Sequence, residues 1–439
     1  MNKKNYVMVL SVMLLILVII ISGCGRRLDR ERFGDRISER IIGGSDDLDD
    51  DRGENGLEGE DSLKRDFHEN GDSSVLEDES SEDEDVDLRD GRDGLGVDQQ
   101  SDNVPLDNEP DSDLDSGEVI SEDCSKPFNS GYRILSLMAL DGSQLITAVW
   151  YPTHDSTFAY SYGSSGVVGE VAFEGILSQC GSFPLVVFSH GFGGCGVQSL
   201  FFTEELAREG YVVVAPDHDD AVCSIKDSGI SLPDFGPGNL GNPREWDDSY
   251  YRERRDDVIL IIDHMLTLNE VTDSFFYGVI DESKIGVSGH SLGGYTAMGI
   301  VGGWNSWKDN RIDVVLLFSP YVQPFLENSN ISNIRVPFMY QGGTLDLGIT
   351  PWIKKDGGAY DQSNPPKFFL ELQGAGHMAW TNFICKSYPT LSSCVELNPT
   401  VHAINYYGIA FLNKYLKNDQ GVEELTGKTS GLKTYEYEF

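Results

Sequence analysis

Basic residues are scarce in this sequence of 439 residues. Lysine and arginine together number 33, against 72 aspartates and glutamates, and the formal net charge is −39 at pH 7. A chain with this field repels phosphate, so we expect no nucleic acid among its partners. The cysteine and histidine patterns of zinc sites, CxxC and HExxH, are also missing from the sequence, so no motif predicts a metal ion.

The negative charge is concentrated in the first third of the chain. Between residues 26 and 123 we count about 36 acidic and about 11 basic residues, and aromatic and β-branched residues are few. Such a segment cannot bury enough apolar surface to offset the entropy of ordering its backbone. We predict a disordered, self-repelling tether over residues 24–124, a folded domain over 125–419 and a short tail over 420–439.

One part of the tether has the acidic spacing of a calcium-binding loop. Asp111, Asp113 and Asp115 alternate, and Glu122 follows at the twelfth position. Loops of this kind need glycine at the sixth position, where the chain turns sharply, and Ser116 stands there instead. We therefore favour a solvated spacer, with calcium binding as the alternative.

The N-terminus carries a short apolar run after Lys3 and Lys4. The run covers about 15 residues, 7–21, which is typical of a signal-peptide core and shorter than the ~20 residues of a spanning helix. It ends in ISGC, which resembles the lipobox of bacterial lipoproteins. We predict a signal peptide over 1–23, lipidation of Cys24 and a membrane-anchored protein of the bacterial cell envelope that faces the periplasm or the cell exterior. An uncleaved membrane anchor is the alternative.

The other cysteines agree with export. Without Cys24, an even number remains, which suggests disulfides in an exported protein; they are Cys124, Cys180, Cys195, Cys223, Cys385 and Cys394. Cys385–Cys394 is the favoured pair, because the two residues flank a short loop. Cys195–Cys223 is the next, because both loops should lie above the predicted sheet.

Strands and helices alternate after residue 130. Short apolar runs predict strands at 134–140, 145–150, 184–189, 211–215, 284–288, 314–318, 336–340 and 368–372, the first two as a hairpin. Apolar residues at helical spacing predict helices at 198–209, 249–268 and 402–416. Continuous apolar strands that alternate with helices indicate an α/β fold, with a mostly parallel central sheet covered by helices on both faces.

A nucleophile elbow follows the predicted strand 284–288. Residues 289–293 read GHSLG and lead into a helical segment. In a G-x-S-x-G elbow the glycines leave room for a tight turn, which presents the serine above the strand ends. Ser291 is therefore the predicted nucleophile. The alternative is a glycine-rich strand–helix turn without a chemical role.

A serine hydroxyl is a weak nucleophile and needs a histidine base. His377 stands in the sequence GAGH, just after the predicted strand 368–372, where a loop can reach the elbow. His264 and His402 fall in predicted helices, and we interpret them as structural or surface residues. His377 is the predicted base.

The base in turn needs an acid, which lies between serine and histidine in the chain order of this kind of fold. Asp346 follows the predicted strand 336–340 within the sequence GGTLD. The glycines there allow a sharp exit from the strand, so Asp346 is the predicted acid. Asp356 and Asp361, further along the same loop, are the alternatives.

Acyl transfer also needs hydrogen-bond donors for a negatively charged oxygen. One predicted donor is the backbone N–H of Leu292, directly after the nucleophile. The other is the N–H of Phe192, in the loop SHGFGG at residues 189–194. We interpret His190 in this loop as a bracing residue and not as a second base.

These motifs resemble the platelet-activating-factor acetylhydrolase-like family of α/β hydrolases, with its bacterial and polyester-hydrolase-like relatives. The resemblance covers about residues 132–416 and is carried by AVWYP (148–152), FPLVVFSHGFGG (183–194), LAREGYVVVAPDH (206–218), RRDDV (254–258), IDESKIGVSGHSLGG (280–294), GGTLD (342–346) and GAGH (374–377). It implies an α/β-hydrolase fold for the domain 125–419 and hydrolysis of short or modified acyl esters, lipid esters among them. It also implies that no cofactor and no metal takes part. Ser291, Asp346 and His377 match the family's triad, and Phe192 matches its oxyanion loop.

The substrate and one alternative function stay open at this point. Insertions at 155–181 and 224–248 are rich in glycine, serine and proline and depart from the family, so the acyl and alcohol groups are not determined. A binding or adhesion module that kept the fold is the alternative, although a complete catalytic set favours an enzyme. A dienelactone hydrolase would carry cysteine in place of Ser291, whereas a peptidase or acyltransferase would use the same machinery.

Overall fold

The computed structural model describes residues 122–163, 165–225, 242–328, 330–419 and 425–439. The predicted signal peptide, Cys24 and nearly all of the predicted tether, including three of the four acidic residues of the candidate calcium loop, lie outside these ranges. Within the ranges, every helix lacks the combination of length and apolar character that a bilayer-spanning segment needs.

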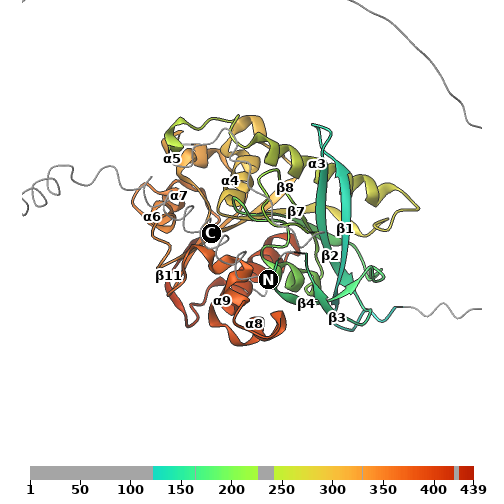
Figure 1. Cartoon of the computed structure of the whole chain (residues 1–439). Coiled ribbons are helices and arrows are strands. Elements are labelled where there is room, and N and C mark those ends of the chain that lie inside the picture. Colours follow the sequence, from blue (N-terminus) through green and yellow to red (C-terminus); the bar gives the residue numbers. More distant parts are fainter. Residues whose placement is uncertain (1–121, 164, 226–241, 329, 420–424) are drawn as a thin grey trace, which may run out of the picture. The chain divides into compact units, whose positions relative to one another are not determined.

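In the described part of the chain, eleven strands form one sheet in the order β11-β10-β9-β8-β7-β5-β6-β2-β1-β4-β3 (Figure 1). The strands from β10 to β6 in this order run parallel and form its centre. The bounds of all eleven strands are β1 (Asn129–Met138), β2 (Gln144–Thr153), β3 (Phe158–Ser161), β4 (Val168–Phe173), β5 (Phe183–Ser189), β6 (Val212–Pro216), β7 (Ile280–His290), β8 (Ile312–Phe318), β9 (Phe338–Gly343), β10 (Lys367–Leu372) and β11 (Leu432–Glu438).

Helices cover both faces of this sheet. One face packs against α2 (Leu200–Arg208), α8 (Leu391–Leu397) and α9 (Pro399–Leu416), and the other against α3 (Arg252–Glu270) and α4 (Leu292–Met298). Shorter helices complete the loops: α5 (Gln323–Asn328), α6 (Thr350–Lys354) and α7 (Ala359–Gln362). The fold is therefore the mostly parallel α/β arrangement that the sequence predicts.

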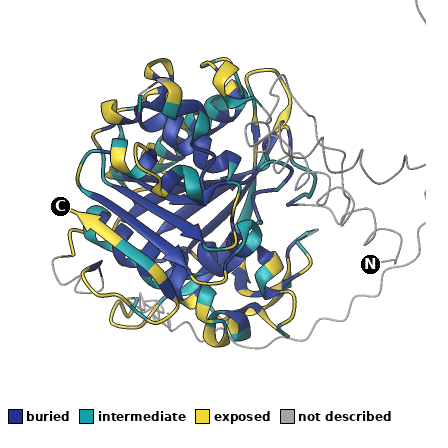
Figure 2. Cartoon of the chain, turned by 90° about the vertical axis from the view of Figure 1, so that its left-hand side faces the viewer, coloured by how far each residue is buried: buried dark blue, intermediate teal, exposed yellow. Residues whose placement is uncertain are grey.

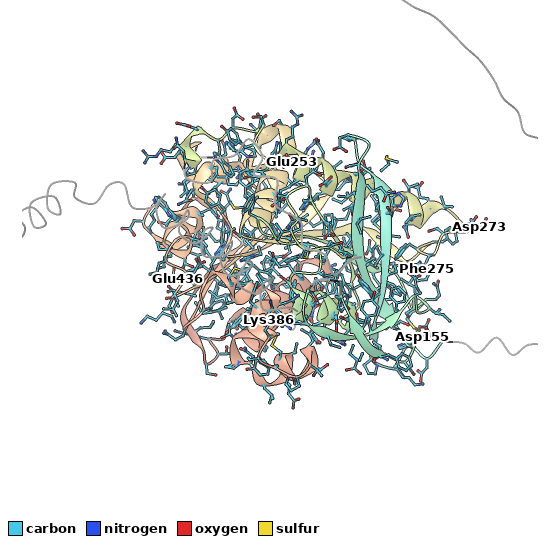
Figure 3. All side chains as sticks on the ribbon, viewed as in Figure 1. Asp155, Glu253, Asp273, Phe275, Lys386 and Glu436 are labelled. Carbon is cyan, nitrogen blue, oxygen red and sulfur yellow. A yellow bond between two sulfur atoms is a disulfide. The ribbon has the colours of Figure 1, made fainter. Side chains whose placement is uncertain are left out.

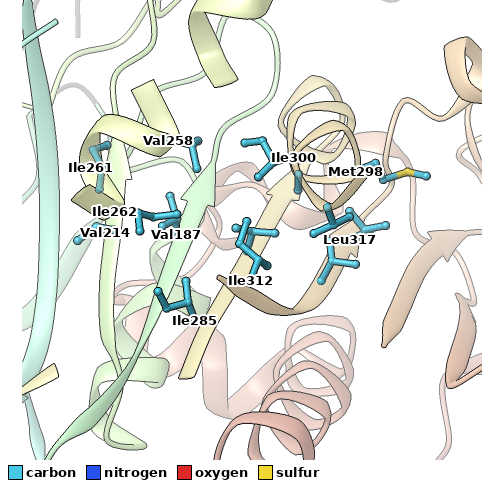
Figure 4. Packing of buried hydrophobic residues seen from close by; sticks show 14 of the residues in the cluster. Val187, Val214, Val258, Ile261, Ile262, Ile285, Met298, Ile300, Ile312 and Leu317 are labelled. Atoms are coloured by element: carbon cyan, nitrogen blue, oxygen red, sulfur yellow. The ribbon is translucent and has the colours of Figure 1, made fainter. Parts of the chain in front are cut away.

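The two-sided burial explains why the central strands are continuous apolar runs. In β8, Leu316 belongs to the core on one face and Leu317 to the core on the other. Figure 4 shows the second face, where Ile262 of α3 lies next to Val187 of β5. Because side chains alternate along a strand, a strand covered on both sides needs apolar residues at every position.

Both edges of the sheet extend beyond the strands that the sequence predicts. At one edge β11 pairs antiparallel with β10, and most of its residues are exposed (Figure 2), so residues 432–438 of the predicted tail belong to the sheet. At the other edge, β3 and β4 form inside the insertion 155–181 and pair antiparallel. The predicted strands and helices are all present, with ends shifted by a few residues.

Disulfides join loops to this core within the described residues. They are Cys124–Cys180, Cys195–Cys223 and Cys385–Cys394. The last two are the pairs that the sequence favours, whereas Cys124–Cys180 was not predicted. This third bond connects the start of the described chain to the end of the insertion 155–181.

Glu122, the last residue of the candidate calcium loop, is bound by protein groups. Its Oε2 accepts a 2.7 Å hydrogen bond from the backbone N–H of Gln179, and its Oε1 lies 2.8 Å from Nδ1 of His154. Cys180 lies close enough to complete a three-residue metal group with them, but its sulfur is committed to the disulfide. The Glu122 carboxylate therefore serves to fasten the beginning of the domain.

Candidate active site

Ser291 lies at the carboxyl end of β7, in the turn that leads into α4. Its φ of 55° and ψ of −114° are unfavourable for a residue with a side chain. A 3.0 Å hydrogen bond from the Ser291 N–H to the carbonyl of Phe318 ties the turn to the neighbouring strand β8. A Cβ on Gly293 would lie 1.9 Å from the Ser189 carbonyl oxygen, so only glycine fits there. The predicted elbow is present, and neighbouring strands hold it in its strained form.

His377 follows β10 and begins the short helix η6 (His377–Trp380). Its Nε2 lies 2.9 Å from Oγ of Ser291. Its Nδ1 faces the carboxylate of Asp346, which only accepts hydrogen bonds, so the ring hydrogen is on Nδ1 and Nε2 can accept a hydrogen bond from the Ser291 hydroxyl. The Nε2–H of His290 donates a 2.9 Å hydrogen bond to the carbonyl of His377, and burial, followed by the charge of His377, lowers the pKa of His290 to about 3. A neutral residue of the elbow thus fixes the backbone of His377.

Asp346 is 3% exposed, and its Oδ2 lies 3.3 Å from Nδ1 of His377. Ser319, at the end of β8, completes this contact: its hydroxyl donates to Oδ2 of Asp346, and its Oγ lies 3.0 Å from Nδ1 of His377. The histidine N–H is therefore shared between a carboxylate and a hydroxyl oxygen. Burial by itself would raise the pKa of Asp346, but the charge of His377 and hydrogen bonds from His377 and Ser319 outweigh burial and hold this pKa below its ordinary value.

The other candidate acids and bases lie elsewhere. Asp356 and Asp361 are exposed, and Asp361 accepts a 2.8 Å hydrogen bond from the N–H of Gly357. His264 lies within α3, and His402 is exposed on α9. The structure thus brings Ser291, His377 and Asp346 together and leaves the alternatives apart. A hydroxyl, an imidazole and a carboxylate in this order can activate an alcohol for attack on a carbonyl carbon.

The two predicted oxyanion donors stand on neighbouring segments. Leu292 is the first residue of α4, directly after Ser291. Phe192 lies in the loop after β5, which packs against the elbow, since a Cβ on Gly191 would lie 2.9 Å from Nδ1 of His290. The side chain of Gln198 ties the two together: its Oε1 accepts from the Gly191 N–H at 3.0 Å, and its amide donates to Nδ1 of His290 at 3.2 Å.

A buried ion pair lies close to the same loop. Arg254 of α3 is fully buried, and its Nη2 lies 2.6 Å from Oδ1 of Asp220. Other charged side chains, such as Asp273 and Glu436, are exposed at the outside of the fold (Figure 3). Sequence reasoning missed the pair of Arg254 and Asp220, because the charged start of a helix is typically exposed. A signal was present, since Arg254 precedes the buried Val258 by four positions and so shares its helix face.

Two kinds of known protein, a platelet-activating factor acetylhydrolase and a cutinase, are similar to the chain in sequence. It is 24% identical over 276 residues to a platelet-activating factor acetylhydrolase of Cavia porcellus, which covers 57% of this chain and 61% of the relative. It is 26% identical over 233 residues to cutinase 2 of Thermobifida cellulosilytica, which covers 52% of this chain and 76% of the relative. The chain thus spans less than two thirds of the acetylhydrolase.

A solved structure agrees on the fold. The ferulic acid esterase from Streptomyces cinnamoneus superposes with a TM-score of 0.50 at 19% sequence identity, over 69% of this chain and 94% of the esterase. The family model described as PET hydrolase-like matches residues 170–431, more than half of the chain, and this segment contains the elbow, Asp346 and His377. The chain therefore belongs to the PET hydrolase-like family of α/β hydrolases.

Proposed function

We propose that this protein is a serine carboxylic-ester hydrolase that works through an acyl-enzyme. The observation that carries the proposal is the 2.9 Å contact between Oγ of Ser291 and Nε2 of His377, made at a strained elbow. Ser291 attacks the ester carbonyl carbon while His377 takes the hydroxyl proton. Asp346 holds the tautomer of the histidine and stabilises the imidazolium that forms.

The remaining steps use groups of the same site. The N–H groups of Phe192 and Leu292 bind the oxygen that becomes negative in the tetrahedral intermediate. His377 then gives its proton to the leaving alcohol, and the acyl group stays on Ser291. A water molecule, deprotonated by His377, attacks the acyl-enzyme and releases the carboxylic acid.

The substrate class we propose is short or modified acyl esters, including lipid esters. The named relatives support an ester, since they comprise an acetylhydrolase and a cutinase. The surface next to the acid supports an apolar or amphiphilic one: Leu345 and Leu347, on either side of Asp346, are 64% and 76% exposed. Exposed apolar side chains that gather into a patch are a feature of surfaces that receive apolar ligands.

We further propose that the enzyme acts outside the cytoplasm, anchored by a lipid on Cys24. The apolar run at 7–21 followed by ISGC supports the anchor, and disulfides support an oxidising compartment. Replacement of Cys24 by serine should release the protein from membranes or block its processing. Mass spectrometry of the mature N-terminus checks this, and an unmodified Cys24 would contradict the anchor.

Hydrolysis of p-nitrophenyl esters of increasing acyl length by the full chain tests the main proposal. We expect hydrolysis by the wild type, and loss of both turnover and fluorophosphonate labelling in Ser291→Ala, with an unchanged circular dichroism spectrum. Full activity in the variant would remove Ser291 from the mechanism. A folded wild type without activity on any ester would instead favour the binding module.

A further inference from the structure

Three buried polar side chains lie behind the loop that carries Phe192: His190, Asp220 and Arg254, which we call the loop clamp. They are 0%, 4% and 0% exposed. Burial of an unpaired guanidinium or carboxylate is strongly unfavourable, so such groups are kept only where their hydrogen bonds are complete. In the loop clamp, each of the three side chains makes at least one of these bonds to the backbone of the loop itself.

His190 holds the carbonyl of the peptide that precedes Phe192. Its Nδ1 lies 2.7 Å from the carbonyl oxygen of Gly191, and its Nε2 accepts a 3.1 Å hydrogen bond from the backbone N–H of His218. Burial, and then the charge of Arg254, lowers the pKa of His190 far below its ordinary value. The ring is therefore neutral, and its single hydrogen is on Nδ1 and points to Gly191.

Arg254 and Asp220 hold the peptides on either side. Nη1 of Arg254 donates to the carbonyl of His190 at 2.7 Å, and Nε and Nη2 donate to Oδ1 of Asp220 at 2.9 and 2.6 Å. The other oxygen of Asp220 accepts a 2.9 Å hydrogen bond from the N–H of Gly193. The backbone is thus fixed on both sides of Phe192.

The orientation of the Phe192 N–H follows from the planarity of the peptide bond. In a trans peptide the carbonyl of one residue and the N–H of the next point in opposite directions. The Gly191 oxygen is drawn toward His190 and also accepts a 2.9 Å hydrogen bond from the Gly194 N–H. The N–H of Phe192 is consequently turned away from the buried side chains.

We propose that the loop clamp aims the Phe192 N–H at the substrate carbonyl oxygen, so that His190, Asp220 and Arg254 are positioning residues for oxyanion stabilisation. This inference rests on the proposed ester hydrolysis. A preorganised donor is effective because it does not have to reorient as charge develops in the transition state.

A second set of hydrogen-bonded Ser, His and Asp side chains contacts the loop clamp, and its role is structural. Oγ of Ser189 lies 2.9 Å from Nε2 of His218, whose Nδ1 lies 2.7 Å from Oδ2 of Asp257. All three residues are buried, so Ser189 cannot meet a substrate. This set instead fastens the end of β5 to the segment after β6, and through His218 it fixes the tautomer of His190.

Variants of His190 and Arg254 in the full chain test the proposal. His190→Asn keeps an N–H donor near the position of Nδ1, whereas His190→Leu removes it, and Arg254→Lys keeps the charge but loses the forked geometry. The measurements are kcat and KM for a soluble ester, and the inhibition constant of a trifluoromethyl ketone, which forms a tetrahedral adduct with a reactive serine. Arg208→Lys is the matched control, because Arg208 pairs with the buried Glu204 away from this loop.

We expect His190→Leu and Arg254→Lys to lower kcat by at least about tenfold with KM within about twofold, since loss of one oxyanion donor lowers kcat by about 10²–10³. The ketone should bind more weakly by the same factor. His190→Asn should recover most of the kcat, and Arg208→Lys should lower the melting temperature without changing kcat.

Two results would overturn the inference: a folded His190→Leu or Arg254→Lys with kcat within twofold of wild type, or a lower kcat with unchanged inhibition by the ketone. If His190→Leu does not fold, Arg254→Lys and His190→Asn decide between the outcomes. A wild type without ester hydrolysis would show that the proposed function itself is wrong, which is distinguishable from an active wild type whose clamp variants behave normally.

Discussion

The hydroxyl oxygen of Ser319 lies 3.0 Å from Nδ1 of His377, closer than the 3.3 Å that separates this nitrogen from the carboxylate of Asp346. Ser319 also donates its own hydrogen to Asp346, so it links His377 and Asp346, the proposed base and acid, directly. It sits at φ 43°, in the left-handed region that is unfavourable for residues with a side chain. A strained backbone is thus maintained at the residue between Asp346 and His377.

Replacement of Ser319 by alanine should lower kcat by about tenfold and leave KM nearly unchanged. The variant loses a hydrogen bond to the carboxylate, and net contributions of hydrogen bonds to charged groups are about 1.5–3 kcal/mol. Ser319→Gly should lose the same activity but be more stable than Ser319→Ala by about 1 kcal/mol, because glycine tolerates a positive φ. Steady-state kinetics and urea unfolding measure both effects; equal kcat for Ser319→Ala and wild type would remove the hydroxyl from the mechanism.

Asp346→Asn should lower kcat by at least about two orders of magnitude, since loss of the orienting acid in a serine protease lowers kcat by about 10⁴ while the geometry survives. Asp356→Asn and Asp361→Asn are matched controls on the same loop and should stay near wild type, because both residues are exposed. A near-normal Asp346→Asn together with an inactive control would reassign the acid.

Ser291→Gly should be more stable than Ser291→Ala. Both variants lose the hydrogen bond to His377, but only alanine retains a side chain at φ 55° and ψ −114°. Strained conformations of this kind destabilise a protein by about 1–3 kcal/mol, and the flexibility of glycine offsets part of this gain. Chemical denaturation of the two variants gives the difference; a less stable Ser291→Gly would show that the elbow is not strained.

The free energy of unfolding should decrease as the pH rises from about 4.5 to about 7, in part because of Glu204. Burial raises the pKa of this carboxyl from 4.5 to about 7, although Arg208 and a hydrogen bond from Tyr162 act in the opposite direction. Between these values the unfolded chain has released the proton and the folded chain still holds it, so folding becomes less favourable. The difference corresponds to roughly 3 kcal/mol, and it should level off above about pH 7.

Glu204→Gln should flatten this pH dependence, and unfolding in urea at several pH values measures it. Other buried carboxyls, such as Asp257, whose pKa burial raises to about 7, contribute in the same direction, so the comparison with wild type is what counts. Glu205→Gln is the control, because Glu205 pairs with the same Arg208 but is partly exposed. Parallel curves for Glu204→Gln and wild type would contradict the prediction.

The sequence predicts the central strands and the residues of the elbow well, because each signal is local. A strand covered on both faces must be apolar throughout, and a G-x-S-x-G turn must follow a strand. The strands at the edges of the sheet, β3, β4 and β11, were not predicted, because their local sequence signals are weaker. In β11 the tyrosines and glutamates alternate as in a half-exposed strand, but this alternation covers only four residues, Tyr435–Glu438.

Residues that act through long-range contacts were harder to find. Ser319 is separated from His377 by 58 positions, and Arg254 from His190 by 64. No local periodicity connects such residues, because the contact depends on which strand ends come together in the folded sheet. Even so, a polar residue directly after a buried strand, as Ser319 is, points to the catalytic edge of an α/β fold.

The disulfide between Cys124 and Cys180 has a practical consequence for recombinant forms of the protein. A truncation at residue 125, where the sequence places the start of the domain, removes Cys124 and leaves the sulfur of Cys180 as a free thiol. Such a thiol can form mixed disulfides or covalent dimers in air. A truncated form that begins before Glu122 retains both the bond and the contacts of Glu122 with His154 and Gln179. It should show no disulfide-linked dimer on non-reducing gels, whereas the shorter form should show one.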